Sequence, residues 1–499
     1  MSQEEIIEHL QTENRRLREQ NAQVAAEVAR LSAEQRQVIA ENEQLRKQVE
    51  ELSKQVHELK GRLAKDSHNS SKPPSTDGYA KKRRRSLRQS SGKKAGGQAG
   101  HQGRTLSLVE SPDEIIVLRP ERCAHCQASL QGIAASGLER RQVVDLPPVV
   151  AQVSEYQAHE VRCPGCQQVT RARFPDAVRA SVQYGPMVKG LAVYLVYGQL
   201  LPYARTAELL SDVCGCPLSP GTLEAFVAEG ASRLLEVEEQ IKQALRAADV
   251  IGTDETGIRV QGVLHWLHTV RTETLTHYAS HRKRGKAATD AIGILPQFHG
   301  VAVHDGYSSY PQYSQCEHAL CNAHHLRDLR FLHEQEQQQW AGQLKDHLLL
   351  CHSTVEEARA TGANGLPPAV LDQLTATYHQ LIESGLAAQP PPLPMPKQRG
   401  RVKQTQAKNL LDRLKRDAAS VLLFMSDFRV PFTNNGAEQD LRMVKVQQKI
   451  SGTFRSEAGP TAFCRIRGYF STMAKQGHRL CLVAQQLFAG VVLVPLGAV

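Results

Sequence analysis

Two short stretches decide the fold: VIGTDETG at residues 250–257 and GVAVHDG at residues 300–306. Both read as apolar β-strands that end in a carboxylate, Asp254 in the first and Asp305 in the second. If the two strands are neighbours in one sheet, the aspartates lie side by side at its edge. Carboxylate oxygens in that arrangement can hold hard divalent cations. Taken alone, each stretch is also an ordinary turn sequence.

The sequence around these stretches indicates further strands. We expect the two apolar strands over Val250–Asp254 and Gly300–His304, with a hairpin formed by Gly262–Val270 and Thr274–Ser280 between them.

A third acid is expected on a later helix that begins within FTNNGAEQDLR, residues 432–442. Helical spacing places an acid and three cations on one face of it: Glu438, Arg442, Lys445 and Lys449. An acid followed by a basic stripe suits a metal ligand beside bound phosphates. The alternative is that Glu438 only completes a cap, with Asn435 as the N-cap residue.

The composition indicates several domains and a polyanionic partner. In 499 residues, 61 Lys and Arg stand against 51 Asp and Glu, which favours nucleic acid or an acidic membrane surface. The first residues include no apolar leader, and the apolar end of the chain is interrupted by Gln485, Gln486 and Pro495. We therefore expect a soluble, cytoplasmic protein without a membrane span, whose eleven cysteines are metal ligands or buried thiols.

Residues 1–63 carry a heptad repeat. Every seventh residue is apolar (Leu10, Leu17, Val24, Leu31, Val38, Leu45, Leu52 and Leu59), and polar residues such as Asn14 and Asn21 interrupt the accompanying a positions. Such a pattern is typical of a parallel coiled coil, so we expect a homodimer or a higher oligomer. The alternative is one long solvated helix.

Residues 64–108 change abruptly to a basic segment rich in Ser, Pro and Gly, which predicts a flexible linker. Its cations can neutralise DNA phosphates without reading sequence, unless the segment is merely a solvated tether. The candidate DNA-binding residues are Lys82, Arg83, Arg84, Arg85, Lys93 and Lys94.

Residues 109–178 contain two Cys-x-x-Cys motifs. Such pairs point two thiolates at one ion, and two pairs complete a tetrahedral shell. We expect a zinc-ribbon-like segment with one structural Zn²⁺, although its spacing is longer than usual. The four ligands are Cys123, Cys126, Cys163 and Cys166.

Residues 179–246 read as helices, with a turn at CGCPLSP before a Ser/Thr-capped helix. This is the helix-turn-helix pattern, in which Thr222–Glu229 would read DNA, but plain helical hairpins look alike.

The motifs together resemble a transposase of the insertion-sequence-66 family over nearly the whole chain. The landmarks follow the zipper in order: DSHNSSKPPSTD, SGKKAGGQAGHQG, the paired cysteines, LPYARTAELL, GTDETG, VHDGYSSY, CNAHHLRDL, TNNGAEQDLR and KISGTFRS. The resemblance implies that Asp254, Asp305 and Glu438 are the catalytic acids of a ribonuclease-H-like core. Cys321 and His324 resemble an accessory motif; with Cys316 and His318 they either bind a second metal or, as we prefer, are buried structural residues.

The expected architecture is a multidomain α+β protein. A ribonuclease-H-like α/β core covers 247–333 and 430–467, a mainly helical insertion covers 334–429, and a helical tail covers 468–499. The insertion contains a helical stretch (Glu334–Gly385), a proline-rich stretch and a basic helix around Arg399–Arg416.

The expected activity is that of a DDE-type DNA transposase that cleaves and joins insertion-sequence ends with two Mg²⁺ (or Mn²⁺) ions. Its partners would be element ends and target DNA, with small accessory proteins of the same element as the resemblance suggests. Arg442, Lys449 and Arg455 are candidate phosphate contacts. The alternatives are a non-catalytic DNA-binding regulator and a nuclease that hydrolyses without joining.

Overall fold

A computed structural model describes residues 3–64, 106–147, 149–389 and 404–497. None of the helices in these ranges is both long and apolar enough to cross a membrane. The expected linker and the proline-rich stretch of the insertion fall largely outside the described residues. So do six of the candidate DNA contacts: Lys82, Arg83, Arg84, Arg85, Lys93 and Lys94.

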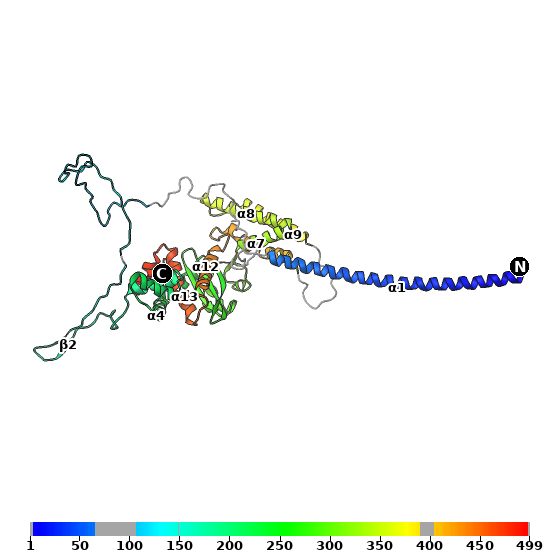
Figure 1. Ribbon diagram of the computed structural model, residues 1–499, viewed down its shortest axis with the longest axis horizontal. Helices are drawn as coiled ribbons and strands as arrows, with labels where there is room; N and C mark the ends of the chain where they lie inside the picture. The colour runs from blue at the N-terminus through cyan, green and yellow to red at the C-terminus, as the bar shows by residue number, and fades with distance from the viewer. Residues whose placement is uncertain (1–2, 65–105, 148, 390–403, 498–499) are drawn as a thin grey trace. The chain divides into compact units, whose positions relative to one another are not determined.

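The N-terminal segment is one continuous helix, α1 (Gln3–Ala64), as the heptads predict (Figure 1). Its apolar stripe is exposed along its length; Leu10, Leu31 and Leu59 each expose about half of their surface. A single helix cannot bury such a stripe on itself, because the residues that share a face cannot contact one another across it. The parallel pairing stays a prediction.

The segment that carries the cysteine motifs has little regular structure. A short antiparallel hairpin, β1 (Glu160–Arg162) and β2 (Val169–Arg171), encloses the second motif, and an isolated bridge between Arg122 and Ser129 encloses the first.

A helical layer follows, formed by α2 (Pro186–Val193), a π-helical turn (Tyr194–Gly198), α3 (Tyr203–Cys214), α4 (Pro220–Arg233) and α5 (Leu235–Arg246). Ser219 caps α4 through the backbone amide of Thr222, as its sequence predicts. The helices share one hydrophobic core with the sheet described next, through residues such as Leu223, Leu245 and Ile251.

The sheet has five strands in the order β5-β4-β3-β6-β7. Strand β3 (Val250–Val260) pairs antiparallel with β4 (Val263–Arg271), which pairs antiparallel with β5 (Thr276–His281). On its other side β3 pairs parallel with β6 (Val301–His304), and β6 with β7 (Glu317–Leu320). Helix α6 (Lys286–Ile292) and two short 3₁₀ turns (Leu295–Gln297 and Tyr310–Gln312) lie in the connections.

The hairpin between β4 and β5 is confirmed, but the prediction that the first strand ends at Asp254 is wrong. Strand β3 continues to Val260 because it pairs with β4 along its whole length. A two-residue turn joins them at Gln261 and Gly262, whose φ angles are 49° and 79°; two positive φ angles match the right-handed twist of a hairpin.

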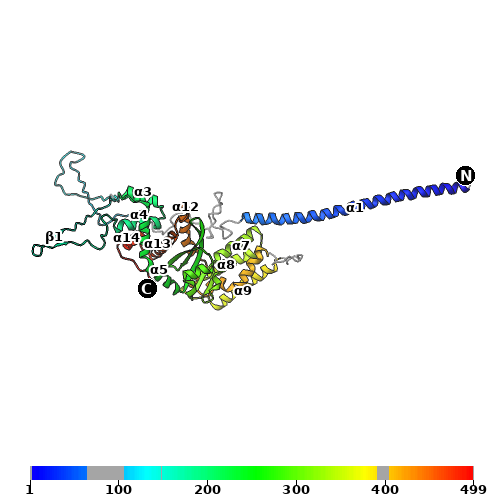
Figure 2. The ribbon, with the colours of Figure 1, turned by 90° about the horizontal axis from the view of Figure 1, so that it is seen from below.

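Helices near the end of the chain cover the sheet (Figures 1 and 2). They are α12 (Asn435–Ser451) and α13 (Ala458–Lys475), whereas α14 (Leu480–Phe488) packs against α2 of the helical layer. The expected boundary at residue 468 falls inside α13. Gly468 does not end a helix; a Cβ there would lie 3.3 Å from the Thr276 carbonyl oxygen, so the glycine lets α13 approach β5 closely.

The insertion lies between Cys321 and Phe428, in a different compact unit from the sheet. It consists of α7 (Asn322–Gln335), α8 (Gln339–Ala360), α9 (Pro368–Ala387), α10 (Gln406–Arg416) and α11 (Ala418–Ser426). Leu344, Leu348 and Tyr378 lie in its core, and the Tyr378 hydroxyl donates to the Leu414 carbonyl at 2.9 Å. Helix α7 starts directly after β7 and runs across residue 334, where the sequence analysis places the start of the insertion.

Candidate active site

Asp254 lies in the middle of β3, where the strand leaves its parallel neighbour. The ladder between β3 and β6 ends at the pair Gly252–Val303. Two residues farther along the chain stand Asp254, which is still on β3, and Asp305, which lies one residue beyond the end of β6. Continued beyond the ladder, this register would set the two aspartates opposite each other, although Asp254 is not at a strand end.

Asp305 sits in a turn that histidines hold in place. The Tyr307 amide donates to the Asp305 carboxylate at 2.9 Å, and the Gly306 amide donates to His304 Nδ1 at 3.0 Å. His304 must then carry its proton on Nε2, which lies 3.1 Å from His318 Nδ1. Burial lowers the pKa of His304 to about 3, so the imidazole is neutral.

The third acid comes from the first turn of α12. The predicted cap is corrected by one residue: Asn434, not Asn435, is the N-cap residue, and its side chain does not cap the helix. Instead the Asn434 amide donates to the Thr253 carbonyl on β3 at 2.8 Å. A Cβ at Gly252 would lie 2.6 Å from Asn434 Oδ1, so glycine is required for this approach. The contact holds the helix that carries Glu438 beside Asp254.

The charges of these acids act on one another. The pKa of Asp254 is raised well above its ordinary value, first by burial, then by the negative charges of Glu255, Asp305 and Glu438. Several carboxylates that repel one another in a partly buried site have the donor chemistry that Mg²⁺ and Mn²⁺ prefer.

Glu255 is a fourth acid that the sequence analysis did not single out. Its side chain is 1% exposed and accepts from the Arg284 guanidinium at 2.7 and 2.8 Å. The Tyr310 hydroxyl donates to its other oxygen. The alternation of side chains along a strand could have identified Glu255. It follows Asp254 directly, so its side chain must point to the opposite face of the sheet.

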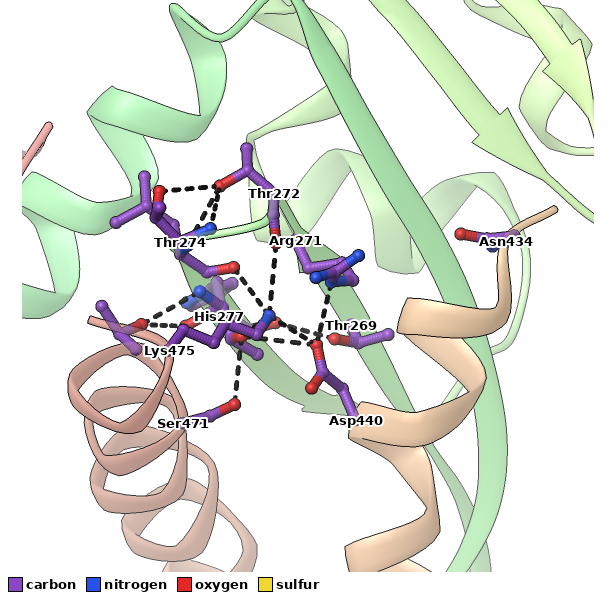
Figure 3. A network of polar contacts seen from close by, with 12 residues as sticks. Thr269, Arg271, Thr272, Thr274, His277, Asn434, Asp440, Ser471 and Lys475 are labelled. Carbon is purple, nitrogen blue, oxygen red and sulfur yellow. Dashed lines mark hydrogen bonds and ion pairs between the residues drawn. The ribbon is translucent and has the colours of Figure 1, made fainter. Parts of the chain in front are cut away.

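A second network fixes the body of α12 (Figure 3). The Asp440 carboxylate lies 3.2 Å from Arg271 of β4 and 2.8 Å from Lys475 of α13. The Tyr278 hydroxyl donates to the Asp440 carbonyl at 2.9 Å. A Cβ at Gly436 would lie 2.0 Å from the Arg271 guanidinium, so this glycine makes room for the ion pair. The network ties the helix of Glu438 to three neighbouring elements.

The predicted basic stripe of α12 divides into two groups. Arg442 and Lys449 are exposed, as is Arg455 after the helix, so all three are open to a ligand. Lys445 instead donates to the Gly257 carbonyl of β3 at 2.6 Å, and burial lowers its pKa. Lys445 thus fastens the helix to the sheet.

A family model for the transposase IS66 family matches residues 181–462, which is more than half of the chain. The protein belongs to the transposase IS66 family. The match contains Asp254, Asp305 and Glu438 and the elements that carry them. Residues 2–107 match a family of unknown function (DUF6444). Among curated proteins, none matches the chain.

The cysteine motifs precede the part that matches the IS66 model. Both form the same turn: the Gln127 amide donates to the Cys123 carbonyl at 3.0 Å, and the Gln167 amide to the Cys163 carbonyl at 2.8 Å. Gln127 and Gln167 have φ angles of 60° and 63°. Amides within each turn lower the pKa of the first cysteine, which favours thiolates.

The two cysteine turns do not meet in this structure. Among the described residues, no group of three or more potential metal ligands includes any of the four cysteines. One zinc ion shared by Cys123, Cys126, Cys163 and Cys166 therefore stays a prediction for this IS66-family chain.

The helix-turn-helix prediction also stays untested, and the charges of α4 do not favour it. The helices and the turn have the expected order, but the exposed side of α4 carries Glu224, Ala225 and Ala228. Its basic residue, Arg233, comes at the C-terminal end. Lys and Arg are common partners of DNA phosphates, and the exposed side of α4 has none before Arg233.

Cys316 and His318 have protein partners. His318 Nε2 lies 3.1 Å from the Tyr313 carbonyl, and the Cys316 thiol donates to the same carbonyl at 3.3 Å. Burial raises the pKa of Cys316, which disfavours the thiolate that a metal needs. These contacts agree with structural roles. Cys321 and His324 begin the separate helical unit.

Proposed function

We propose that the protein is a DDE-type transposase that cleaves and joins DNA ends at a centre formed by Asp254, Asp305 and Glu438. One observation carries the proposal: β3, the turn after β6 and the first turn of α12 each contribute one acid, and the charges of Asp305 and Glu438 act on Asp254. A regulator that only binds DNA has no need of such mutually repelling acids.

The sheet topology supports a ribonuclease-H-like core. Three antiparallel strands followed by two parallel ones, with acids on the central β3 and after its neighbour β6, match the expectation from the family resemblance. In open α/β sheets, ligands bind outside the carboxyl ends of parallel strands, which is where Asp305 stands.

The chain's own groups would hold and orient the reactants. Two Mg²⁺ ions, when bound by the three carboxylates, would supply Lewis acidity to the attacking and leaving oxygens. Asn434 and Asp440 keep Glu438 next to the sheet, and the Tyr307 amide fixes the Asp305 carboxylate. Exposed Arg442, Lys449 and Arg455 would contact the DNA backbone.

The remaining parts are proposed to assemble the complex. The exposed stripe of α1 would pair with a second copy in a coiled coil. The two cysteine turns would come together on one structural Zn²⁺, and the basic linker would bind DNA without sequence preference. Small accessory proteins of the same element are further expected partners.

The test is a joining assay with full-length protein, Mg²⁺, a target plasmid and labelled DNA taken from either side of this coding sequence. Asp254→Asn, Asp305→Asn and Glu438→Gln should each abolish cleavage and joining but leave end binding largely intact. Asp249→Asn is the matched control and should stay active, since the side chain of this acid just before β3 is exposed and forms a 3.5 Å ion pair with the exposed Arg429.

Full joining by any of the three variants would refute the role of that residue. Cut ends without joined products from the wild type would indicate a nuclease instead. Tight DNA binding without any metal-dependent cleavage would indicate a regulator.

A further inference from the structure

A strongly basic connection leaves the sheet near the proposed centre. Residues 281–286, from the last residue of β5 to the first residue of α6, read His-Arg-Lys-Arg-Gly-Lys, and the first acid after them is Asp290. Arg282, Lys283 and Lys286 are exposed. Four cations within five residues on a connection are a candidate surface for a polyanion.

The register of the sheet brings this connection to the end where the acids stand. His281 pairs with Trp266, and Trp266 pairs with Gly257, three residues beyond Asp254 on β3. Strands β3 and β5 run in the same direction. The chain therefore leaves β5 at the same end of the sheet to which β3 runs after Asp254.

The side chain of Arg284, in this connection, contacts residues of β3 and β4. Its guanidinium pairs with Glu255 of β3 and lies 3.9 Å from the ring centre of Tyr307 and 4.8 Å from that of Trp266. Tyr307 is the residue whose amide holds the Asp305 carboxylate. Burial alone would lower the pKa of Arg284, but Glu255, Tyr307 and Asp305 together raise it.

Arg284 and α12 approach the acids from opposite faces of the sheet. Gly252 faces α12, because a Cβ there would meet Asn434, and Asp254 lies on the same face by alternation. Glu255 points to the other face, toward Arg284 and Tyr310. DNA that crosses the end of the sheet would therefore meet cations from both sides.

The side chain of Arg284 remains 36% exposed although it is paired and flanked by two rings. A guanidinium held in this way keeps free N–H groups in a fixed direction, which suits a phosphate. The neighbouring ion pair between Arg282 and Glu457 would compete only weakly with a DNA phosphate for Arg282. The two side chains lie 3.2 Å apart but are 75% and 57% exposed.

We infer that residues 282–286 bind the DNA backbone beside the reacting phosphate, and that Arg284 makes the innermost of these contacts. This inference rests on the proposed function, since it assumes that DNA reaches the acids of the sheet. Its first test measures binding and its salt dependence, which do not require catalysis.

The first test compares Arg282→Gln/Lys283→Gln with the wild type, as full-length proteins, on a labelled duplex of about 40 base pairs taken from beside the coding sequence. Loss of two phosphate contacts should make the slope of log affinity against log salt shallower by about 1.8, so the affinity lost between about 50 and 200 mM salt should be about tenfold smaller. The control is Arg30→Gln/Arg36→Gln, which removes two exposed cations from α1. An unchanged slope, or an equal change in the control, would overturn the inference.

The second test separates substrate contact from a counterion role of Arg284. Arg284→Met alone would leave the buried Glu255 carboxylate without its counter-charge. The test therefore uses the double variant Arg284→Met/Glu255→Gln. If Arg284 contacts phosphate, the double variant should fold, and its slope of log affinity against log salt should be about 0.9 shallower than that of Glu255→Gln alone. It should also cleave DNA at least about tenfold more slowly than Glu255→Gln alone. If the double variant equals Glu255→Gln in slope and cleavage, Arg284 is only a counterion.

The failures of the two proposals are distinguishable. Asp254→Asn should keep the wild-type salt slope but lose cleavage. Cleavage by that variant would refute the carboxylate centre whatever the slopes of the loop variants are.

Discussion

Replacing Asp440 with asparagine removes the negative charge that Arg271 and Lys475 share beneath α12. The carboxylate is 13% exposed, and its partners are 21% and 16% exposed, so water cannot take its place easily. The asparagine side chain would keep a hydrogen-bond acceptor but leave two largely buried cations without a counter-charge.

Removing one partner of a buried ion pair costs about 3–5 kcal/mol, because the remaining charge stays desolvated. At about 2–4 °C per kcal/mol for a unit of this size, the lower figure corresponds to a loss of about 6–12 °C in melting temperature. Glu457→Gln is the matched control: its pair with Arg282 is exposed and should be worth about 0–1 kcal/mol.

The measurement uses tryptophan fluorescence during thermal unfolding. The chain has two tryptophans, Trp266 on β4 and Trp340 in the helical insertion, so a Trp340→Phe background makes the signal report on the sheet. If Asp440→Asn lowers the melting temperature no more than Glu457→Gln does, the network does not hold α12, and our account of how Glu438 is positioned is wrong.

Further predictions concern Asn434, Lys475 and the two cysteine turns. Asn434→Ala should lower the free energy of unfolding by about 1–3 kcal/mol and slow end cleavage, because the buried Thr253 carbonyl loses its donor, while the exposed Asn435→Ala should change little in the same assays. Burial lowers the pKa of Lys475 from 10.5 to about 8, so between these pH values the unfolded chain binds this proton more strongly than the folded protein does. The stability of the wild type should therefore rise with pH from about 8 to 10.5. Lys475→Met should lack this rise in thermal melts. Purified protein should contain one zinc per chain by mass spectrometry, lost in Cys123→Ser but kept in the buried control Cys214→Ser.

Local sequence patterns predicted those helices and strands whose formation depends mainly on residues close together in the sequence. The run Val301–His304 is buried on both faces and reads as a strand without further information. The heptads predicted α1, and the turn at CGCPLSP before a Ser/Thr-capped helix predicted α4. The three acids came from short motifs supported by a family resemblance.

Contacts between distant segments could not be read in this way. The extension of β3 depends on β4, which pairs with residues that in isolation resemble a turn. The pairs of Glu255 with Arg284 and of Asp440 with Lys475 join elements whose approach only the fold decides. The sequence analysis places a boundary at residue 468, whereas Gly468 lies inside α13 and permits its close packing on β5.

The most direct test of the central claim exchanges one ligand of the proposed metal centre and then the metal. Asp305→Cys replaces a carboxylate with a softer thiolate, which binds Mg²⁺ poorly and transition-metal ions better. Our account predicts that this variant is inactive in end joining with Mg²⁺ and regains activity with Mn²⁺, while Asp249→Cys is active with both. Activity of Asp305→Cys with Mg²⁺ equal to that of the wild type would contradict the account.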